Sequence, residues 1–168
     1  DQHVRARLRD LNSEVVGLRY FNVYGPREAH KEAMTSIAYQ AHRQLLERGR
    51  IELFEGSGGY GDGEQRRDFV WVGDTVSVKL WVLEHPELSG IFNVGTGRAQ
   101  SFNEVARAVI AYHGRGEILY VPMPEALAGK YQSYTEANLS SLRKAGYTAR
   151  FHSVEEAVPL YLAWLEER

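Results

Sequence analysis

Residues 67–113 read RDFVWVGDTVSVKLWVLEHPELSGIFNVGTGRAQSFNEVARAVIAYH, and this stretch decides the fold class. Within it, β-branched and aromatic residues predict strands at 68–72 and 90–94. A helix is expected after each strand, the first with Asp74 as its N-cap and the second with Ser101 in a capping box. Strands that alternate with helices in this way indicate α/β architecture.

The same alternation extends on both sides of this stretch. Composition and length predict further strands at 15–20, 51–54 and 117–121. Further helices are expected at 2–11, 33–48, 139–142 and 154–165, the second of them ended by Gly49. The apolar helix positions that we expect in the core include Trp81, Trp164, Leu162 and Leu165.

The composition of the 168 residues is that of an ordinary globular protein, with 43% hydrophobic and 25% charged residues. There are 20 Lys and Arg against 22 Asp and Glu, so the chain lacks the basic excess of a typical nucleic-acid binder. The absence of Cys excludes disulfides, cysteine–zinc sites and thiol catalysis. No apolar run approaches the roughly 18 residues that suggest a membrane span. We therefore expect neither a nucleic-acid partner nor a membrane partner.

Two glycine patterns invite a dinucleotide-binding interpretation. Residues 56–61 read GSGGYG and satisfy G-x-G-x-x-G, but a strand rather than a helix is expected after them. Because that fingerprint needs a helix N-terminus at the pyrophosphate, a flexible loop is the favoured interpretation. The GTG at 95–97 lies between a strand and a helix, where we expect a tight turn.

Residues 22–27 follow the first predicted strand, at the edge where open α/β sheets place ligands. The same loop carries Glu28, His30 and Lys31. A functional site and a solvated charged turn are equally supported here. A lysine in such a place can act as a base where desolvation lowers its pKa. Because His30 has no second His at a metal-ligand spacing, no metal site is expected.

Arg66, Arg67 and Asp68 stand where a predicted strand begins, and they allow two interpretations. The planar fork of an arginine suits phosphate, whereas a surface ion pair between Asp68 and a neighbouring arginine is favoured on sequence alone. Tyr131 and Tyr134 lie in a loop, where they can stack on a base or simply pack. No G-x-S-x-G elbow is present, so serine hydrolase chemistry has no support.

Three blocks, in order along the chain, resemble the extended short-chain dehydrogenase/reductase family, which includes nucleotide-sugar epimerases and dehydratases. They read LRYFNVYGPR at 18–27, RDFVWVGD at 67–74 and GIFNVGTG at 90–97. Finer features resemble the ADP-heptose 6-epimerase branch of that family, namely REAHK at 27–31, LFEGS at 53–57 and GKYQSYT at 129–135. The resemblance covers almost the whole chain.

The resemblance implies that residues 1–168 form the C-terminal part of an NAD(P)-binding Rossmann-like fold, interleaved with the smaller substrate-binding subdomain. The chain starts at Asp1 without an initiator Met, and no Tyr is followed by Lys four residues later. In the family, the Tyr-x-x-x-Lys motif and the cofactor loop lie upstream. We therefore expect the N-terminal cofactor-binding half to be absent. Alone, the chain is expected to be inactive and, with a bare sheet edge, to aggregate or oligomerise.

The resemblance also implies a reaction. NADP removes hydride from C6 of ADP-D-glycero-D-manno-heptose and returns it to the opposite face, which gives the L-glycero epimer. Each face needs its own proton transfer, and Lys31 is implied as one acid–base group and, with Val23, as a cofactor contact. The implied substrate contacts are Asn22, Ala33, Gln40, Phe54, Glu55, Gly56, Ser57, Arg67 and Tyr131. The family often has Ser at position 33 and His at position 40, and this chain differs at both.

Two alternatives remain beside this function. One is another nucleotide-sugar 4-epimerase or dehydratase of the same family, and the other is a non-catalytic nucleotide-sugar-binding module. For the first function the resemblance implies three partners: the ADP-heptose substrate, the missing N-terminal half and further copies of the chain in a homo-oligomer, pentameric in this branch. It also implies the bacterial cytoplasm and synthesis of a lipopolysaccharide core precursor, and the lack of Cys agrees with that compartment.

Overall fold

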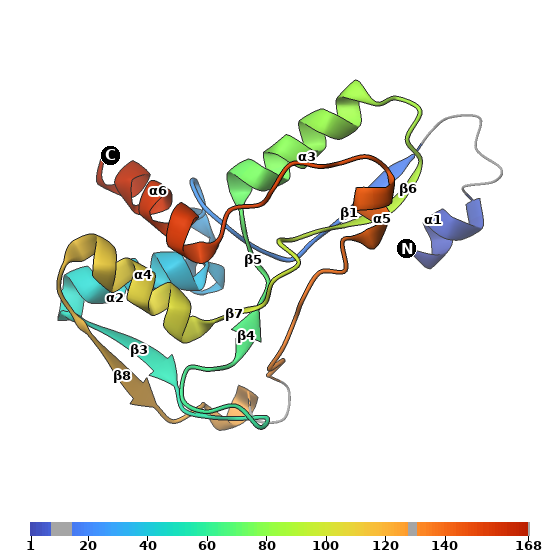
Figure 1. The fold of residues 1–168 in the computed structure, drawn as a ribbon. Helices are drawn as coiled ribbons and strands as arrows, with labels where there is room; N and C mark the ends of the chain where they lie inside the picture. The colour runs from blue at the N-terminus through green and yellow to red at the C-terminus, as the bar shows by residue number, and fades with distance from the viewer. Residues whose placement is uncertain (8–14, 128–130, 168) are drawn as a thin grey trace.

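The computed structural model describes residues 1–7, 15–127 and 131–167, and Figure 1 shows how their elements are arranged. The strands are β1 (Val16–Tyr20), β2 (Asn22–Tyr24), β3 (Arg50–Phe54), β4 (Arg66–Arg67), β5 (Phe69–Trp71), β6 (Gly90–Val94), β7 (Gln100–Ser101) and β8 (Glu117–Val121). The α-helices are α1 (Gln2–Arg7), α2 (Ile37–Arg48), α3 (Val72–Glu84), α4 (Phe102–His113), α5 (Ser140–Lys144) and α6 (Val154–Glu166), and the 3₁₀ helices are η1 (Ala29–Met34) and η2 (Glu125–Leu127). The alternation confirms the predicted α/β fold, and residues 8–11 of the first expected helix lie outside the described residues.

One hydrophobic core forms where α3 and α5 pack against the β1–β6 pair. These two strands are parallel, with Val16 opposite Gly90 and Tyr20 opposite Val94. A parallel pair needs a long crossover, and part of the chain between the two strands supplies α3. The buried residues of this core are Val70, Val78, Phe92, Val94, Leu142, Tyr147 and Phe151. Trp81, which we expected in the core, is partly buried and packs against this cluster.

A second core lies at the other end, between the β3–β8 pair and the helices α2, α4 and α6 (Figure 1). The burial of β3 alternates along the strand, as its sequence predicts, with Ile51 and Leu53 buried. Leu162 is fully buried here, and Trp164 and Leu165 pack against the cluster, which confirms their expected place.

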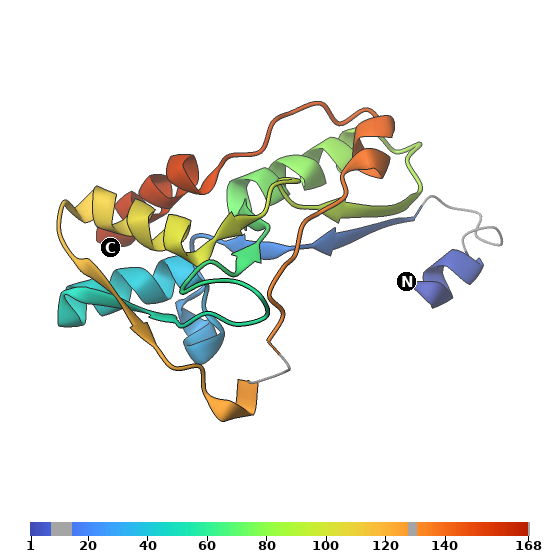
Figure 2. The ribbon, with the colours of Figure 1, turned by 60° about the horizontal axis from the view of Figure 1, so that its bottom comes forward.

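The middle of the molecule joins the two cores. In β5, Phe69 contributes to the second core and the adjacent Val70 to the first, because successive strand residues point to opposite faces. The segment from residue 131 onwards, orange in Figures 1 and 2, runs towards α5. Its backbone brackets β4: Arg66 N–H donates to Ser133 O at 2.9 Å, and Thr135 N–H donates to Arg66 O at 3.2 Å.

The helix predicted at 33–48 begins later than expected. Ser36 is the N-cap of α2, and its hydroxyl accepts a hydrogen bond from Tyr39 N–H. The preceding turn is η1, in which Glu32 has φ 49° and ψ −117°, so a continuous α-helix cannot pass through it. The C-terminal end is as predicted, because Gly49 adopts the left-handed conformation at φ 70°.

Asp68 is not the surface ion-pair partner that its neighbouring arginines predict. Its side chain is fully buried and accepts hydrogen bonds from Thr96 N–H at 2.7 Å, Gly97 N–H at 2.9 Å and Ala137 N–H at 2.9 Å. The expected tight turn at 95–97 is present, with Gly97 at φ 73°. The ion-pair prediction was wrong because this turn and the 131–137 segment supply backbone donors that sequence proximity does not reveal.

Asp74 does not cap α3, which corrects the second expectation for this region. The helix begins at Val72 with Trp71 as its N-cap, and the cap has no side-chain hydrogen bond. Asp74 instead accepts a hydrogen bond from His152 N–H at 2.7 Å, and its other oxygen lies 2.8 Å from His152 Nδ1. The carboxylate therefore ties α3 to the segment that leads into α6, a contact that local spacing does not encode.

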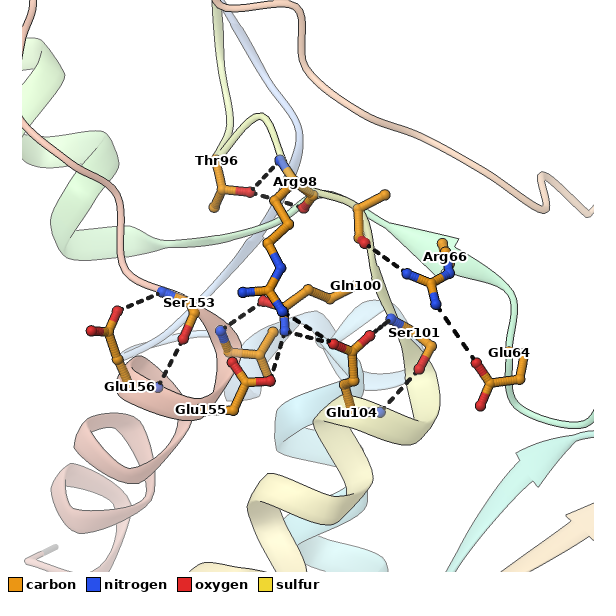
Figure 3. Close-up of polar contacts among 12 residues, drawn as sticks. Glu64, Arg66, Thr96, Arg98, Gln100, Ser101, Glu104, Ser153, Glu155 and Glu156 are labelled. Atoms are coloured by element: carbon orange, nitrogen blue, oxygen red, sulfur yellow. Dashed lines mark hydrogen bonds and ion pairs between the residues drawn. The ribbon is translucent and has the colours of Figure 1, made fainter.

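The N-termini of α4 and α6 meet in a polar cluster (Figure 3). The capping box predicted for α4 is present, and Ser153 and Glu156 form a second one at α6. Gln100 links the two helices, since its Nε2 donates to Glu104 at 3.1 Å and to Glu155 at 2.9 Å, and its Oε1 accepts from Val154 N–H. This cluster sets the position of the first turn of α4, which faces the candidate site.

Candidate active site

A cavity of about 340 Å³ lies between α2, the end of β3 and the first turn of α4. Its aromatic lining comes from three different segments: Phe54 at the end of β3, Phe102 at the start of α4, and Tyr131. The Phe54 and Tyr131 rings meet edge to face, with centroids 5.9 Å apart. Gln40, Gln44 and Gln65 add amide groups to the lining. A cavity that combines aromatic walls with amide groups suits an organic ligand with a planar portion.

Arg67 places a buried positive charge beside this cavity. The residue is 7% exposed, and its Cζ lies 5.1 Å from the Tyr131 ring centroid and 5.8 Å from that of Phe102. Nη1 donates to Arg66 O at 3.0 Å. Burial lowers the pKa of Arg67, and Tyr131 acts in the opposite direction.

No carboxylate among the residues that the structure describes forms an ion pair with Arg67. A buried charge is costly unless it is paired. The geometry therefore provides a place for an anionic ligand group such as a phosphate.

Residues 54–57, which we call the rim, run on from the end of β3, and of these four Phe54 is the one that lines the cavity. Glu55 N–H continues the strand pairing by donating to Val121 O at 2.9 Å. A Cβ on Gly56 would lie 2.5 Å from Tyr60 O, so only glycine fits the backbone there. The GSGGYG stretch is a loop between β3 and β4, with no helix at its last glycine, which confirms the interpretation against a dinucleotide fingerprint.

Other predicted site residues lie on a second group of segments. Asn22 is exposed in β2, and its Oδ1 accepts from the Thr135 hydroxyl at 3.3 Å, which links it to the segment that carries Tyr131. Val23 is half-buried against the first core. Lys31 is exposed on η1, and its N–H donates to Glu28 O at 2.9 Å. Ala33 is also on η1, and its side chain is outside what the structure describes.

The structure thus brings one set of predicted residues together and leaves the other apart. Gln40, Phe54 and Tyr131 line one cavity. Arg67 lies beside this cavity, where its guanidinium contacts the ring of Tyr131. Lys31, Val23 and Asn22 are not among the residues that line it. The two sets are connected through Thr35, which follows η1 and also lines the cavity.

The charged loop before α2 is not simply a solvated turn. Glu28 is 3% exposed, and its carboxylate accepts from Ser36 N–H at 2.7 Å and from the Ser36 hydroxyl at 2.6 Å. It closes the loop on which Lys31 is carried. His30 and Lys31 themselves remain exposed.

Sequence reasoning missed Gln65, Phe102 and Gln44 as lining residues. Gln65 stands next to the Arg66–Arg67 pair, and this position was the available signal for it. Phe102 and Gln44 lie on helices, where nothing in the local pattern distinguishes a cavity wall from ordinary packing.

Comparison with protein-family models decides the classification. Residues 1–95 match the model of the NAD dependent epimerase/dehydratase family. The chain belongs to this family. The resemblance of the 18–27, 67–74 and 90–97 blocks is thereby confirmed.

Individual members of the epimerase/dehydratase family are also similar to the chain. An ADP-L-glycero-D-manno-heptose-6-epimerase of Alkalilimnicola ehrlichii is 60% identical over 162 residues, which cover 96% of this chain and 51% of that protein. The crystal structure of the Helicobacter pylori ADP-L-glycero-D-manno-heptose-6-epimerase superposes with a TM-score of 0.81 at 30% identity, covering 98% of this chain and 48% of that one.

A Thermus thermophilus UDP-glucose 4-epimerase, solved with NAD, gives a TM-score of 0.75 at 25% identity over 98% of this chain and 50% of its own. The chain spans about half the length of the curated relatives that it matches. The α/β fold is therefore the Rossmann-like fold of this family over that half.

Two further observations concern metal sites and membrane-spanning helices in the part of the chain that the structure describes. Within it, no group of three or more His, Cys, Asp or Glu side chains is arranged to hold a metal ion. None of its described helices combines the length and apolar character needed to cross a membrane.

Proposed function

We propose that a protein containing this chain converts ADP-D-glycero-D-manno-heptose to ADP-L-glycero-D-manno-heptose by epimerisation at C6. The 60% identity to a relative of that name supports the proposal, as does the similarity of the fold to the Helicobacter pylori epimerase. Residues 1–168 would be the C-terminal part, in which the end of the Rossmann domain is interleaved with the substrate-binding subdomain.

The single observation that carries the proposal is the buried guanidinium of Arg67. It has no carboxylate partner among the described residues, and it lies over the rings of both Phe102 and Tyr131. The pyrophosphate of a nucleotide sugar is an anion that would complete this environment. Phe54 and Tyr131 would flank the nucleotide, and Glu55, Gly56, Ser57 and Gln40 would supply polar contacts to it.

The acid–base role is assigned to Lys31 on η1. A lysine on a closed loop can donate a proton as the ammonium, or accept one as the free amine, to or from a substrate held beside it. Asn22 would bind the sugar from β2, and Ala33 offers its backbone. Inversion at C6 needs a second acid–base group for the other face, and no Tyr-x-x-x-Lys motif occurs in this sequence. We assign that group to the cofactor-binding half of the complete protein.

The cofactor is proposed to be NADP, which supplies the hydride transfer at C6. Val23 and Lys31, on consecutive segments after β1, are the residues of this chain proposed to contact it. The GSGGYG loop opens no helix, and the GTG turn binds Asp68, so neither provides a pyrophosphate cradle for the cofactor. We therefore propose that this chain contacts one edge of the cofactor and that the cofactor-binding half of the complete protein holds the rest.

The proposal is tested with Lys31→Ala in the complete protein. We expect kcat for ADP-heptose epimerisation to fall by about 10²–10⁴-fold, because a positioned acid–base group contributes that much. Lys144→Ala, a matched change on α5, should leave kcat unchanged. Full activity of the Lys31 variant would contradict its assignment.

A substrate panel separates the second candidate, a UDP- or dTDP-sugar 4-epimerase or dehydratase, which the similarity to the UDP-glucose 4-epimerase favours. Turnover of those sugars without turnover of ADP-heptose would replace the first proposal. Binding without any turnover would indicate a nucleotide-sugar-binding module. Assays with NADP and NAD in parallel test the cofactor.

The assembly and the compartment complete the proposal. We propose a homo-oligomer, pentameric like the branch that the sequence resembles, in the bacterial cytoplasm. Sedimentation velocity of the complete protein tests the number of subunits, and a monomer would contradict it.

A further inference from the structure

The loop between β3 and β4 is closed on itself at the rim of the cavity. Gly63 N–H donates to Phe54 O at 3.0 Å, which joins the far side of the loop to the last residue of β3. Gly56 N–H donates to the Asp62 carboxylate at 2.7 Å, and Glu64 N–H donates to Gly61 O at 3.0 Å. The loop thus has one defined path although it is rich in glycine.

Gln65 holds the rim residues directly. Its side chain is buried, with the residue 2% exposed, and its Nε2 donates to Glu55 O at 3.0 Å and to the Ser57 hydroxyl at 3.1 Å. These two bonds bracket Gly56. Gln65 also lines the cavity, so it connects the rim to the ligand space.

Asn103, in the first turn of α4, holds the other side of the loop. Its Nδ2 donates to Asp62 O at 2.8 Å and to the Glu64 carboxylate at 2.6 Å, and its N–H donates to Gly63 O at 3.0 Å. The Tyr120 hydroxyl donates to Asn103 Oδ1 at 3.1 Å. Both polar groups of this side chain are therefore bonded, the amide nitrogen to the loop and the amide oxygen to β8.

The fit at this anchor is close. Gly63 has φ 66°, and a Cβ there would lie 2.4 Å from Asn103 Oδ1. The residue before Asn103 is Phe102, whose ring lines the cavity. The same helical turn thus supplies a wall of the cavity and the anchor of its rim.

We propose that Gln65 and Asn103 are positioning residues that hold Glu55, Gly56 and Ser57 in the conformation that binds the nucleotide sugar. The proposal rests on the function proposed above for this cavity. A rim that is ordered before binding does not lose loop entropy on binding, so its anchors raise affinity. Lys31 is on a separate segment, so the proton-transfer step should be little affected.

The test measures KM and kcat of the complete protein with ADP-heptose. Gln65→Met keeps the volume of the side chain and removes both donated hydrogen bonds. We expect KM to rise about tenfold, in line with about 1.4 kcal/mol of lost binding, while kcat changes less than about threefold. Gln65→Glu, which cannot donate to Glu55 O, should behave alike. Gln132→Met, the same change at an exposed position, should match the wild type.

Asp62→Ala is the second variant, because it removes the acceptor for Gly56 N–H at the exposed surface of the loop without disturbing a core. KM should rise about threefold or more with kcat retained, and Asn103→Ala should raise KM at least as much as Gln65→Met. If Gln65→Met and Asp62→Ala both keep the wild-type KM, the positioning role is wrong. A fall in kcat at constant KM would also overturn it. A wild-type protein that turns over no nucleotide sugar would overturn the proposed function instead.

Discussion

At the scale of single residues, Asp68 forms hydrogen bonds with several segments that are distant in sequence. Its carboxylate accepts from the 95–97 turn and from Ala137, and its own backbone O accepts from Asn22 N–H at 3.0 Å. A Cβ on Gly95 would lie 2.8 Å from the Asp68 carboxylate, so the turn can approach only because that residue is glycine. The buried side chain thus ties the 95–97 turn and Ala137 to the start of β5, and the backbone of the same residue adds Asn22.

Asp68→Asn should therefore lower the free energy of unfolding by about 2–4 kcal/mol, because the amide replaces one acceptor with a donor that faces buried N–H groups. Urea denaturation followed by circular dichroism measures the change. Glu136→Gln, an equivalent change at an exposed carboxylate that bonds Tyr134, should alter stability by less than about 0.5 kcal/mol. Equal stabilities of the two variants would contradict the role given to Asp68.

At the scale of elements, the strands and the C-terminal ends of helices follow from the sequence. The strands predicted at 15–20, 51–54, 90–94 and 117–121 are all present, and Gly49 ends α2. The errors concern helix starts. Neither Glu32, which breaks the helix before α2, nor Asp74, which binds His152, is in a position that local propensity describes. In both cases the backbone or side chain is set by distant segments.

The packing of α2 against α4 contains a pair of histidines. His42 Nδ1 lies 3.0 Å from His113 Nε2, and the rings stack with centroids 5.1 Å apart. Burial lowers the pKa of His42, and His113 lowers it further. Glu166 of α6, which also bonds Tyr112, acts in the opposite direction.

The folded chain therefore binds a proton at His42 less tightly than the unfolded chain does. Stability from this pair is fully present above the ordinary His pKa of about 6.5 and falls as the pH drops below it, because unfolding then takes up protons. We expect the urea midpoint to decline from pH 7 to pH 5. The decline should be shallower in His42→Gln and unchanged in His30→Gln, which alters an exposed imidazole. A wild-type midpoint that is constant over this range would disprove the expectation.

At the scale of the whole molecule, α3 presents an apolar stripe. Val76, Leu80 and Leu83, spaced four and three residues apart, are 45%, 54% and 77% exposed on one helix face. Beneath α3, β1 pairs with β6 and with no other strand that the structure describes. An unpaired edge and an apolar stripe both favour association.

When the 168-residue chain is expressed by itself, we expect it to self-associate. The paired change Leu80→Lys with Leu83→Glu should reduce the weight-average mass measured by sedimentation velocity at about the same net charge. Leu46→Lys, at an isolated exposed leucine of α2, should have little effect. A monodisperse wild-type monomer would show that neither feature drives association.

The sequence by itself determined the α/β alternation, most element ends and the family, because periodicity, caps and short blocks of residues act locally. It also indicated Phe54, Arg67 and Tyr131 as candidates for one site. Only the tertiary structure decided that Asp68 is buried, that Arg67 lacks a carboxylate partner among the described residues, and that Gln65 and Asn103 fasten the rim. These properties depend on segments up to 69 residues apart in the sequence. Such distant segments remove water from a side chain, and the residues next to that side chain in the sequence do not reveal this.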